Sequence, residues 1–168
     1  MGGRAKGLLV APDGVPIVER TLAIVREASL EPVLVGDAVA YAHLGVDALD
    51  DAPSGIGPLG GLVALLRRAH GSFVLAIACD MPFVSRALIV ALRDAPPAAV
   101  VAPRSDGRWE PLFARYDSRA VLRLAEANVA AAAHSLQRLL AAAGAVELPI
   151  DDAARNTLRD WDSPEDAR

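Results

Sequence analysis

The sequence predicts a single α/β domain spanning residues 1–168, in which helices cover both faces of a sheet. Short apolar runs typical of strands alternate along the chain with helical segments of about ten residues. Of the 168 residues, 53% are hydrophobic and 23% are charged, which favours one compact core over a disordered chain. Neither an internal repeat nor an interdomain linker interrupts this alternation.

The first predicted helix follows from hydrophobic periodicity. Val18, Leu22 and Val25 share one helical face, and charged residues occupy the opposite face over residues 16–30. Short strands are predicted before and after this helix, at 8–10 and 32–36, and a weak helix and a weak strand near 46–49 follow.

A loop, a helix and a strand are predicted in the middle of the chain. The stretch DDAPSGIGPLGG at 50–61 has the composition of a loop and leads into a helix at 62–69. The apolar run at 73–79 predicts a buried strand. Ser85 is in position to cap a helix that continues through Arg93.

The last third of the chain continues the same alternation. Asp117 and Ser135 are each placed to cap a helix. Strands are predicted at 99–102, 109–116 and 146–150, ahead of a polar tail.

Composition excludes several classes of function. A net charge of −4 and a pI near 5.3 give no sign of a nucleic-acid surface. No apolar run approaches the roughly 20 residues that span a bilayer, and the start does not resemble a signal peptide. Cys79 is the single cysteine, so an internal disulfide is impossible. These features predict a cytoplasmic protein without a membrane partner.

Asp80 is the strongest candidate for a functional side chain. It follows the apolar strand at 73–79, and ligands of open α/β sheets bind beyond the carboxyl ends of strands. A carboxylate there can hold Mg²⁺, which prefers a few hard oxygen ligands together with substrate phosphates. An aspartate that only caps a helix or a turn is the alternative interpretation.

The glycine-rich stretch SGIGPLGG is a second, weaker signal. Its glycines, at 55, 57, 60 and 61, let a backbone approach a flat or phosphorylated ligand. It lacks the GK[ST] ending of the Walker A pattern. Neither Cys79 nor the three histidines show metal-ligand spacing, so they are interpreted as structural residues.

Two aspartates in the tail form a third candidate. Asp160 and Asp162 share one side of an extended backbone, so that a metal could meet one or both. Ser163 and Pro164 equally suit the start of a helix. We expect both, with the helix beginning where the carboxylate must be fixed.

Taken together, these segments resemble the molybdenum cofactor guanylyltransferase family of nucleotidyltransferases. The resemblance covers nearly the whole chain, and the order and spacing of the segments carry it. They are MGGRAKGLL at 1–9, GIGPLGGL at 55–62, LAIACDMPFV at 75–84, EPLFARY at 110–116, SLQRLL at 135–140 and DWDSPED at 160–166.

The resemblance implies a Rossmann-like three-layer α/β/α fold with a mostly parallel sheet. It also implies transfer of GMP from GTP to the terminal phosphate of molybdopterin, with release of pyrophosphate and with Mg²⁺ as cofactor. GTP and the molybdopterin cofactor would be the partners, and molybdoenzymes or their chaperones further ones. Such a reaction needs positioning and charge neutralisation more than a covalent nucleophile.

Roles for individual residues follow from the same resemblance. Lys6 matches a lysine that contacts the nucleotide phosphates, and Gly2 and Gly3 close the phosphate loop. Asp80 matches the aspartate that binds Mg²⁺. Lys6 and Asp80 are therefore the predicted catalytic residues.

The resemblance also assigns the base-binding segment and the tail. Leu59, Gly60 and Gly61 match the segment packed against the guanine. Asp162 is assigned to the metal together with Asp80. Asp160 and Asp162 align with a motif in which members of the family often have asparagines.

The N-terminus departs from the family pattern. Family members carry an apolar strand and a glycine-rich LAGG-x-S-x-R segment before the methionine that matches Met1, and Ala5 stands where aspartate is common. We therefore expect an N-terminally incomplete chain, through a misplaced start or a real truncation. Residues 1–168 alone should bind GTP weakly and self-associate.

Three alternatives remain open at the level of the sequence. One is a molybdenum cofactor cytidylyltransferase, because base choice rests on few contacts. Another is a catalytically silent protein that binds the cofactor or a partner enzyme. A sugar-phosphate nucleotidyltransferase is the third, although those chains usually run longer.

Overall fold

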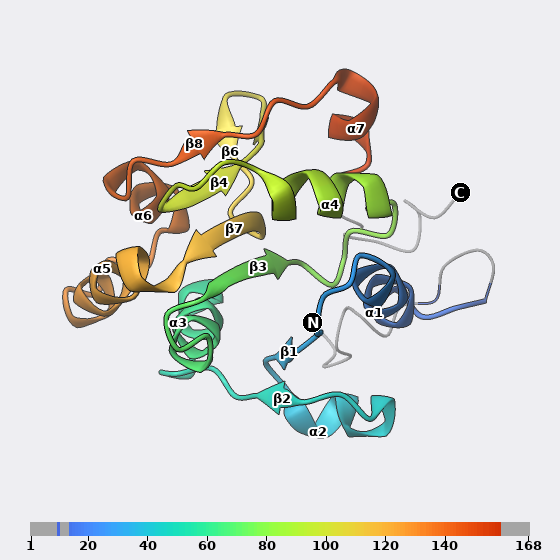
Figure 1. The fold of residues 1–168 in the computed structure, drawn as a ribbon. Helices are drawn as coiled ribbons and strands as arrows, with labels where there is room; N and C mark the ends of the chain where they lie inside the picture. The colour runs from blue at the N-terminus through green and yellow to red at the C-terminus, as the bar shows by residue number, and fades with distance from the viewer. Residues whose placement is uncertain (1–9, 11–13, 159–168) are drawn as a thin grey trace.

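A mixed four-stranded sheet forms the centre of the fold. The computed structural model describes Val10 and residues 14–158. The strands lie in the order β3-β7-β4-β8, and β7 runs antiparallel to both of its neighbours while β4 and β8 are parallel (Figure 1). Three of the four strands therefore share one direction. Their bounds are β3 Phe73–Ile77, β7 Phe113–Asp117, β4 Val100–Ala102 and β8 Val146–Glu147.

Two smaller strand pairs accompany this sheet. One is parallel and lies near the N-terminal helix, and the other is an antiparallel hairpin that follows β4. The parallel pair consists of β1 (Leu34–Val35) and β2 (Ala48–Leu49), with α2 (Ala38–Tyr41) and η2 (Ala42–Leu44) between them; the hairpin consists of β5 (Arg104–Ser105) and β6 (Arg108–Trp109).

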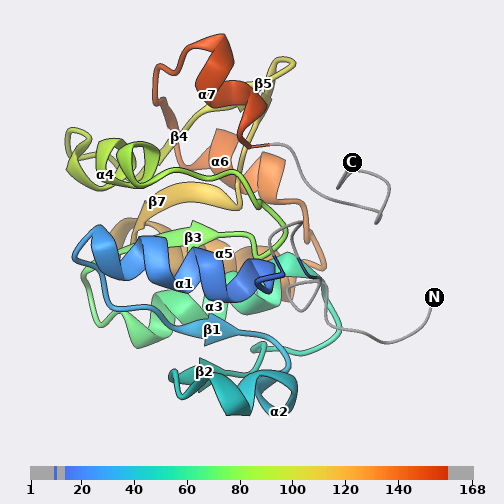
Figure 2. The same cartoon turned by 90° about the vertical axis from the view of Figure 1, so that its right-hand side faces the viewer.

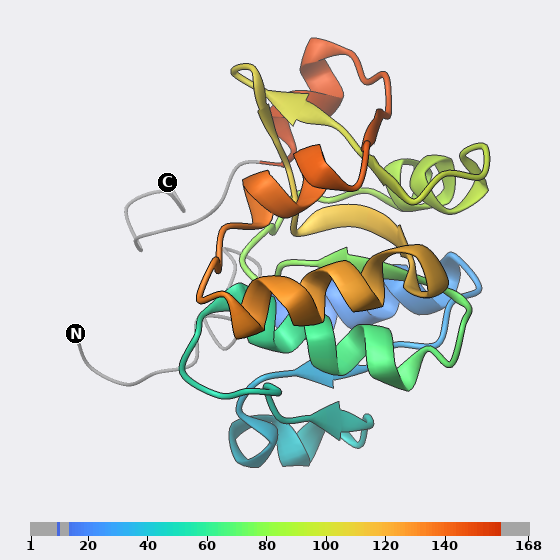
Figure 3. The same ribbon diagram turned by 90° about the vertical axis from the view of Figure 1, so that its left-hand side faces the viewer.

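Helices cover both faces of the sheet. On one face lie α1 (Ile17–Glu27) and α4 (Arg86–Asp94), which are nearest the viewer in Figure 2. On the other lie α3 (Pro58–Arg68), α5 (Ser118–Ala130) and α6 (Leu136–Ala142), which are nearest in Figure 3. This arrangement confirms the predicted three-layer α/β/α class.

Alternation of side chains along the strands divides the core into two layers. Ala76 and Tyr116 are buried with the helices α3, α5 and α6. Leu75, Ile77 and Phe113 pack instead in the layer that contains α4 and the end of α1. β3 and β4 are apolar on both faces because both faces of the sheet are covered.

The predicted helix caps are confirmed. The Ser85 Oγ accepts from the Leu88 N–H at 3.3 Å, and the Asp117 carboxylate accepts from the Arg119 N–H at 2.9 Å. Ser135 caps α6 in the same way. A further short helix, α7 (Asp152–Asn156), is capped by Asp151 and was not predicted.

Two boundaries differ from the sequence prediction. The helix expected to begin at Leu62 begins at Pro58, because proline suits the first helical position and Gly57, with φ of 75°, turns the chain into it. The single strand expected at 109–116 is divided between β6 and β7. Pro111 lies in the interruption, and it has no N–H to donate to a ladder.

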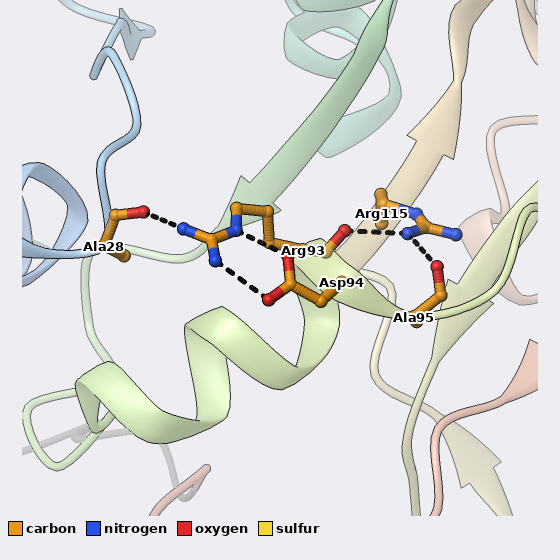
Figure 4. A network of polar contacts seen from close by, with 5 residues as sticks. All are labelled: Ala28, Arg93, Asp94, Ala95 and Arg115. Carbon is orange, nitrogen blue, oxygen red and sulfur yellow. Dashed lines mark hydrogen bonds and ion pairs between the residues drawn. The ribbon is translucent and has the colours of Figure 1, made fainter.

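Two arginines, the buried Arg115 and the partly exposed Arg93, join α4 to its neighbours (Figure 4). Arg115, which is 4% exposed, donates from Nη1 to the carbonyls of Arg93 at 2.9 Å and Ala95 at 2.5 Å. Burial lowers the pKa of Arg115 from its ordinary value. Arg93 donates to the carbonyl of Ala28 at the end of α1 and pairs with Asp94 at 2.7 Å. These contacts hold α4 against the end of α1 and against β7.

Candidate functional site

The candidate site begins where β3 ends. Asp80 is partly buried and lies in a turn held at both ends by the backbone. The Ala78 N–H donates to the Leu112 carbonyl at 2.7 Å, and the Val84 N–H donates to the Met81 carbonyl at 3.4 Å. Met81 is 3% exposed and anchors the turn in the core. A rigid strand therefore delivers this carboxylate to the carboxyl edge of the sheet, as predicted.

A cavity of about 750 Å³ extends from Asp80 along the whole of β3. Its other walls come from α1, α3 and the segment that contains β1. Asp51 lines the same cavity and was not singled out in the sequence. The available signal was its position, because Asp51 follows β2 just as Asp80 follows β3.

The glycine-rich loop between β2 and α3 is shaped by close packing. The Ala52–Pro53 peptide bond is cis. A Cβ atom at Gly60 would lie 2.3 Å from the Pro53 carbonyl oxygen, which no side chain can tolerate. At Gly61 it would lie 3.1 Å from the Asp51 carboxylate. Packing of the loop on the helix thus accounts for Gly60 without any ligand, whereas a side chain at Gly61 would require only a small shift of Asp51 and Val35.

The three residues assigned to the guanine differ in their exposure. The Leu59 side chain is fully buried in the core under α3, so only its backbone can face a ligand. Within the described part of the chain, no hydrogen bond is recorded for the Leu59 N–H. Gly61 lines the cavity that reaches Asp80. Contact of Leu59, Gly60 and Gly61 with a base stays a prediction.

The hairpin that follows β4 contributes to the same edge, because β4 shares the direction of β3. The Gln137 amide accepts from the Trp109 N–H at 3.1 Å and donates to the Trp109 carbonyl at 2.7 Å. The Arg104 guanidinium lies 4.0 Å from the centre of the Trp109 ring. Arg155 of α7 donates to the Arg104 carbonyl. Within the SLQRLL motif, Gln137 therefore has a structural role, because it binds the backbone of Trp109.

Tyr116 supports this edge from inside the core. Its hydroxyl donates to the Pro111 carbonyl at 2.7 Å, and the neighbouring Leu112 carbonyl receives the Ala78 N–H of β3. Burial raises the pKa of the Tyr116 hydroxyl above its ordinary value. The EPLFARY motif therefore contains a buried hydrogen bond that holds the segment beside Asp80 in place.

The predicted metal ligands, Asp80 and Asp162, stay predictions. Over Val10 and residues 14–158, no group of three or more His, Cys, Asp or Glu side chains is placed to hold a metal. Asp80 and Asp51 both line the cavity, and Mg²⁺ commonly binds through one or two carboxylates together with substrate phosphates. Asp160 and Asp162 lie outside the described residues.

The remaining predicted site residues also lie outside the described part of the chain. They are Gly2, Gly3 and Lys6, and their roles stay predictions. Cys79 lines the cavity beside Asp80. Among the helices that the structure describes, none has the length and apolar character needed to cross a bilayer.

Sequence comparison identifies the family. Residues 1–147 match the MobA-like NTP transferase domain. This chain belongs to the MobA-like NTP transferase family. The molybdenum cofactor guanylyltransferase of Pseudomonas entomophila is 36% identical over 98% of this chain and 88% of that relative. That of Pseudomonas putida strain F1 is 36% identical over 98% and 87%. The predicted resemblance is confirmed.

Solved structures share the fold of this MobA-like chain. Molybdopterin-guanine dinucleotide biosynthesis protein A from Archaeoglobus fulgidus superposes with a TM-score of 0.79 at 22% identity, covering 98% of this chain and 88% of that one. The 2-C-methyl-D-erythritol 4-phosphate cytidylyltransferase from Thermus thermophilus gives 0.72 at 20% identity, covering 96% and 90%. At these identities the likeness supports the Rossmann-like nucleotidyltransferase fold.

Proposed function

We propose that this chain transfers GMP from GTP to the phosphate of molybdenum-molybdopterin, giving the guanine dinucleotide cofactor and pyrophosphate. The observation that carries the proposal is the 36% identity over 98% of the chain to a molybdenum cofactor guanylyltransferase. In support, Asp80 lies at the carboxyl end of β3, where an α/β sheet binds its ligands.

The proposed step is an exchange of one P–O bond for another. A phosphate oxygen of molybdopterin forms a bond to the α-phosphorus of GTP. The bond from that phosphorus to the bridging oxygen of the β-phosphate breaks, and pyrophosphate leaves with the electron pair. The attacking phosphate is already ionised, so no residue needs to act as general base.

The residues of the chain then have to position the phosphates and balance their charge. Asp80 would hold Mg²⁺, which when bound neutralises negative charge on the transferred and leaving phosphates. Lys6 would add a compact positive charge on the same groups. The Leu59 N–H lies in the first turn of α3, where N–H groups have no partner within the helix, and it can donate to an anionic ligand.

The test is a turnover assay with molybdopterin as acceptor and Mg²⁺ present or removed by a chelator. Pyrophosphate release with GTP that stops on chelation is expected. Release with CTP alone would instead establish a cytidylyltransferase. Cofactor binding without release from either nucleotide would establish a silent binding protein.

Lys6 can be tested in the same assay. Lys6→Arg should weaken GTP binding and slow transfer, because a broad planar guanidinium replaces a compact ammonium near glycines. Equal binding and turnover by Lys6→Arg and the parent would remove Lys6 from the proposed mechanism.

A further inference from the structure

The hairpin of β5 and β6 holds an arginine and a tryptophan in fixed contact. Its turn consists of Asp106 and Gly107, both with positive φ, which is the geometry of a tight hairpin turn. The register of the hairpin places Arg104 opposite Trp109, so their side chains lie on the same face. The Arg104 guanidinium accordingly lies 4.0 Å from the centre of the indole ring.

Both residues of this contact are also held from outside the hairpin. The Gln137 side chain bonds to the N–H and to the carbonyl of Trp109, at 3.1 Å and 2.7 Å. The Arg104 carbonyl accepts a hydrogen bond from Arg155 of α7, and the Arg104 Nε lies 4.0 Å from the Glu147 carboxylate. The guanidinium is therefore held in one orientation before any ligand arrives, which lowers the entropic cost of binding one.

The contacts of Arg104 within the protein leave its hydrogen-bonding capacity unused. Its Nε is buried and has no hydrogen-bond partner among the described residues, because 4.0 Å to Glu147 is too long for one. Over the same residues, no hydrogen bond is recorded from Nη1 or Nη2, and 41% of the side chain is exposed. A donor buried without a partner costs stability. Stability therefore does not explain why the guanidinium is held here.

The exposed part of the guanidinium suits a flat ligand. Trp109 covers one face of the guanidinium plane, so the opposite face and the Nη groups account for the exposure. A guanidinium stacks on flat conjugated rings and donates hydrogen bonds within its own plane. We call this surface, made by Arg104 and Trp109, the Arg104–Trp109 platform.

The Arg104–Trp109 platform lies at the edge of the sheet that carries Asp80. β3 and β4 run in the same direction with β7 between them, so their carboxyl ends lie two strand spacings, about 10 Å, apart. Asp80 follows the end of β3 at Ile77, and Arg104 follows the end of β4 at Ala102. A pterin ring with a phosphate ester on a short side chain is long enough to contact both.

The platform and the segment assigned to the guanine lie on opposite sides of Asp80. A Cβ atom at Gly61 would lie 3.1 Å from the Val35 side chain, which places Gly61 beside β1. β1 lies on the side of β3 that is away from β7, whereas the hairpin follows β4, beyond β7 (Figure 1). Attacking and leaving oxygens are roughly in line across the transferred phosphorus, so the acceptor has to occupy space that GTP leaves free. The platform is on that side.

We infer that the Arg104–Trp109 platform binds the pterin ring of the acceptor, with the ring stacked on the exposed face of the guanidinium and the phosphate directed toward Asp80. This assignment rests on the proposed function, because molybdopterin is the acceptor there. It makes Arg104 a binding residue for the acceptor and not for GTP.

Steady-state kinetics with both substrates varied test the assignment. Arg104→Met keeps an unbranched side chain over the indole ring but removes the guanidinium. It should raise the KM for molybdopterin at least about tenfold and leave the KM for GTP within about twofold, because only one substrate loses a contact. Arg104→Lys keeps the charge without the plane and should be impaired to a similar degree.

Arg108→Met is the matched control. Arg108 precedes Trp109 in β6, so its side chain points to the opposite face of the hairpin, and the variant loses the same charge. Its KM values for both substrates should equal those of the parent. Urea unfolding of each variant shows whether it remains folded.

Equilibrium dialysis measures the same contact without turnover. The probes are hydroxymethylpterin phosphate and inorganic phosphate, each in the presence of Mg²⁺. Arg104→Met should weaken binding of the pterin phosphate at least about tenfold and leave binding of inorganic phosphate unchanged, because Arg104 is assigned to the ring.

The outcomes separate the platform from the proposed function. Turnover by Arg104→Met with an unchanged KM for molybdopterin, or an equal loss in Arg108→Met, would refute the platform and leave the proposed function standing. Binding of the pterin phosphate that depends on Arg104, without transfer of GMP, would support the platform and refute the proposed function. Full activity of Arg104→Lys would show that charge suffices and would refute stacking. An equal loss for inorganic phosphate, or a raised KM for GTP alone, would assign Arg104 to phosphate or to the nucleotide and overturn the inference.

Discussion

The two sides of β3 differ in what borders them within the described part of the chain. Toward β7 the strand pairs over its whole length, from Phe73 opposite Asp117 to Ile77 opposite Phe113. Toward β1 it borders a cavity that ends at Asp80. The paired side contributes stability, and the open side ends at Asp80, the residue proposed to hold the metal. Substitutions on the two sides should therefore separate stability from activity.

The largest effect is expected on the open side. Asp80→Asn should lower the rate of nucleotidyl transfer roughly a thousandfold, because one charge is lost where the metal would be held. The free energy of unfolding should change by less than about 1 kcal/mol, since the amide keeps the shape of the carboxylate. Pyrophosphate release and urea unfolding measure the two quantities.

A matched control is available in the hairpin turn. Asp106→Asn removes one charge from an exposed carboxylate on the same edge of the sheet and should leave both quantities unchanged. Near-normal turnover by Asp80→Asn, or an equal loss in Asp106→Asn, would contradict the assignment of Asp80.

The largest loss of stability is expected on the paired side of β3, in β7. Arg115→Met removes the donors to the carbonyls of Arg93, Ala95 and Pro96, and should lower the free energy of unfolding by about 3–5 kcal/mol. Arg115→Lys keeps the charge but not the fork of donors and should recover only part of the loss. A change below about 1 kcal/mol for Arg115→Met in urea unfolding would show that these contacts are not needed.

A smaller loss is expected at Tyr116. Tyr116→Phe keeps the buried ring but leaves the Pro111 carbonyl without its donor, and should cost about 1–2 kcal/mol of unfolding free energy. Turnover per folded molecule should not change. Urea unfolding beside a turnover assay gives both numbers, and a selective loss of turnover would place Tyr116 in the site itself.

The same hydroxyl predicts a dependence on pH. Burial raises the pKa of Tyr116 in the folded state above the value of about 10 that it has when unfolded. The stabilisation of the neutral hydroxyl is complete below about pH 10, and it is lost as the pH rises from there toward the folded pKa. Unfolding measured across that range should show a decline that Tyr116→Phe lacks. An identical decline in both proteins would assign it to other groups.

The smallest effect is expected at a surface ion pair. Arg67 and Glu126 lie 2.8 Å apart, with side chains 52% and 40% exposed. Arg67→Ala should change the free energy of unfolding by no more than about 1 kcal/mol, because solvent screens such pairs. A loss as large as that of Arg115→Met would mean that burial does not decide how much each arginine contributes to the free energy of unfolding.

The sequence predicted the position of Asp80 for a local reason. An apolar run that ends on a carboxylate marks the end of a buried strand, and the run can be recognised without knowledge of the neighbouring strands. The capping residues Ser85, Asp117 and Ser135 were predictable on the same basis, since each acts within one turn of its own helix.

The cavity and its second carboxylate could not be predicted in this way. Which edges of β1 and β3 border the cavity depends on the order of strands in space. Asp51 reaches the cavity only because β2 and α3 bring it beside Gly61. The contact of Gln137 with Trp109 likewise joins two segments 28 residues apart. The hairpin turn, Asp106-Gly107, did have a local signal that the sequence prediction missed.

The stacking of Arg104 on Trp109 also gives the protein an optical reporter. The indole ring belongs to a hairpin at the edge of the sheet that carries Asp80, and a guanidinium 4.0 Å from its centre sets its electrostatic surroundings. A ligand that draws Arg104 away changes the field at the ring and shifts its fluorescence. With Trp161→Phe as the background, emission from Trp109 alone would follow ligand binding in real time, without a dye.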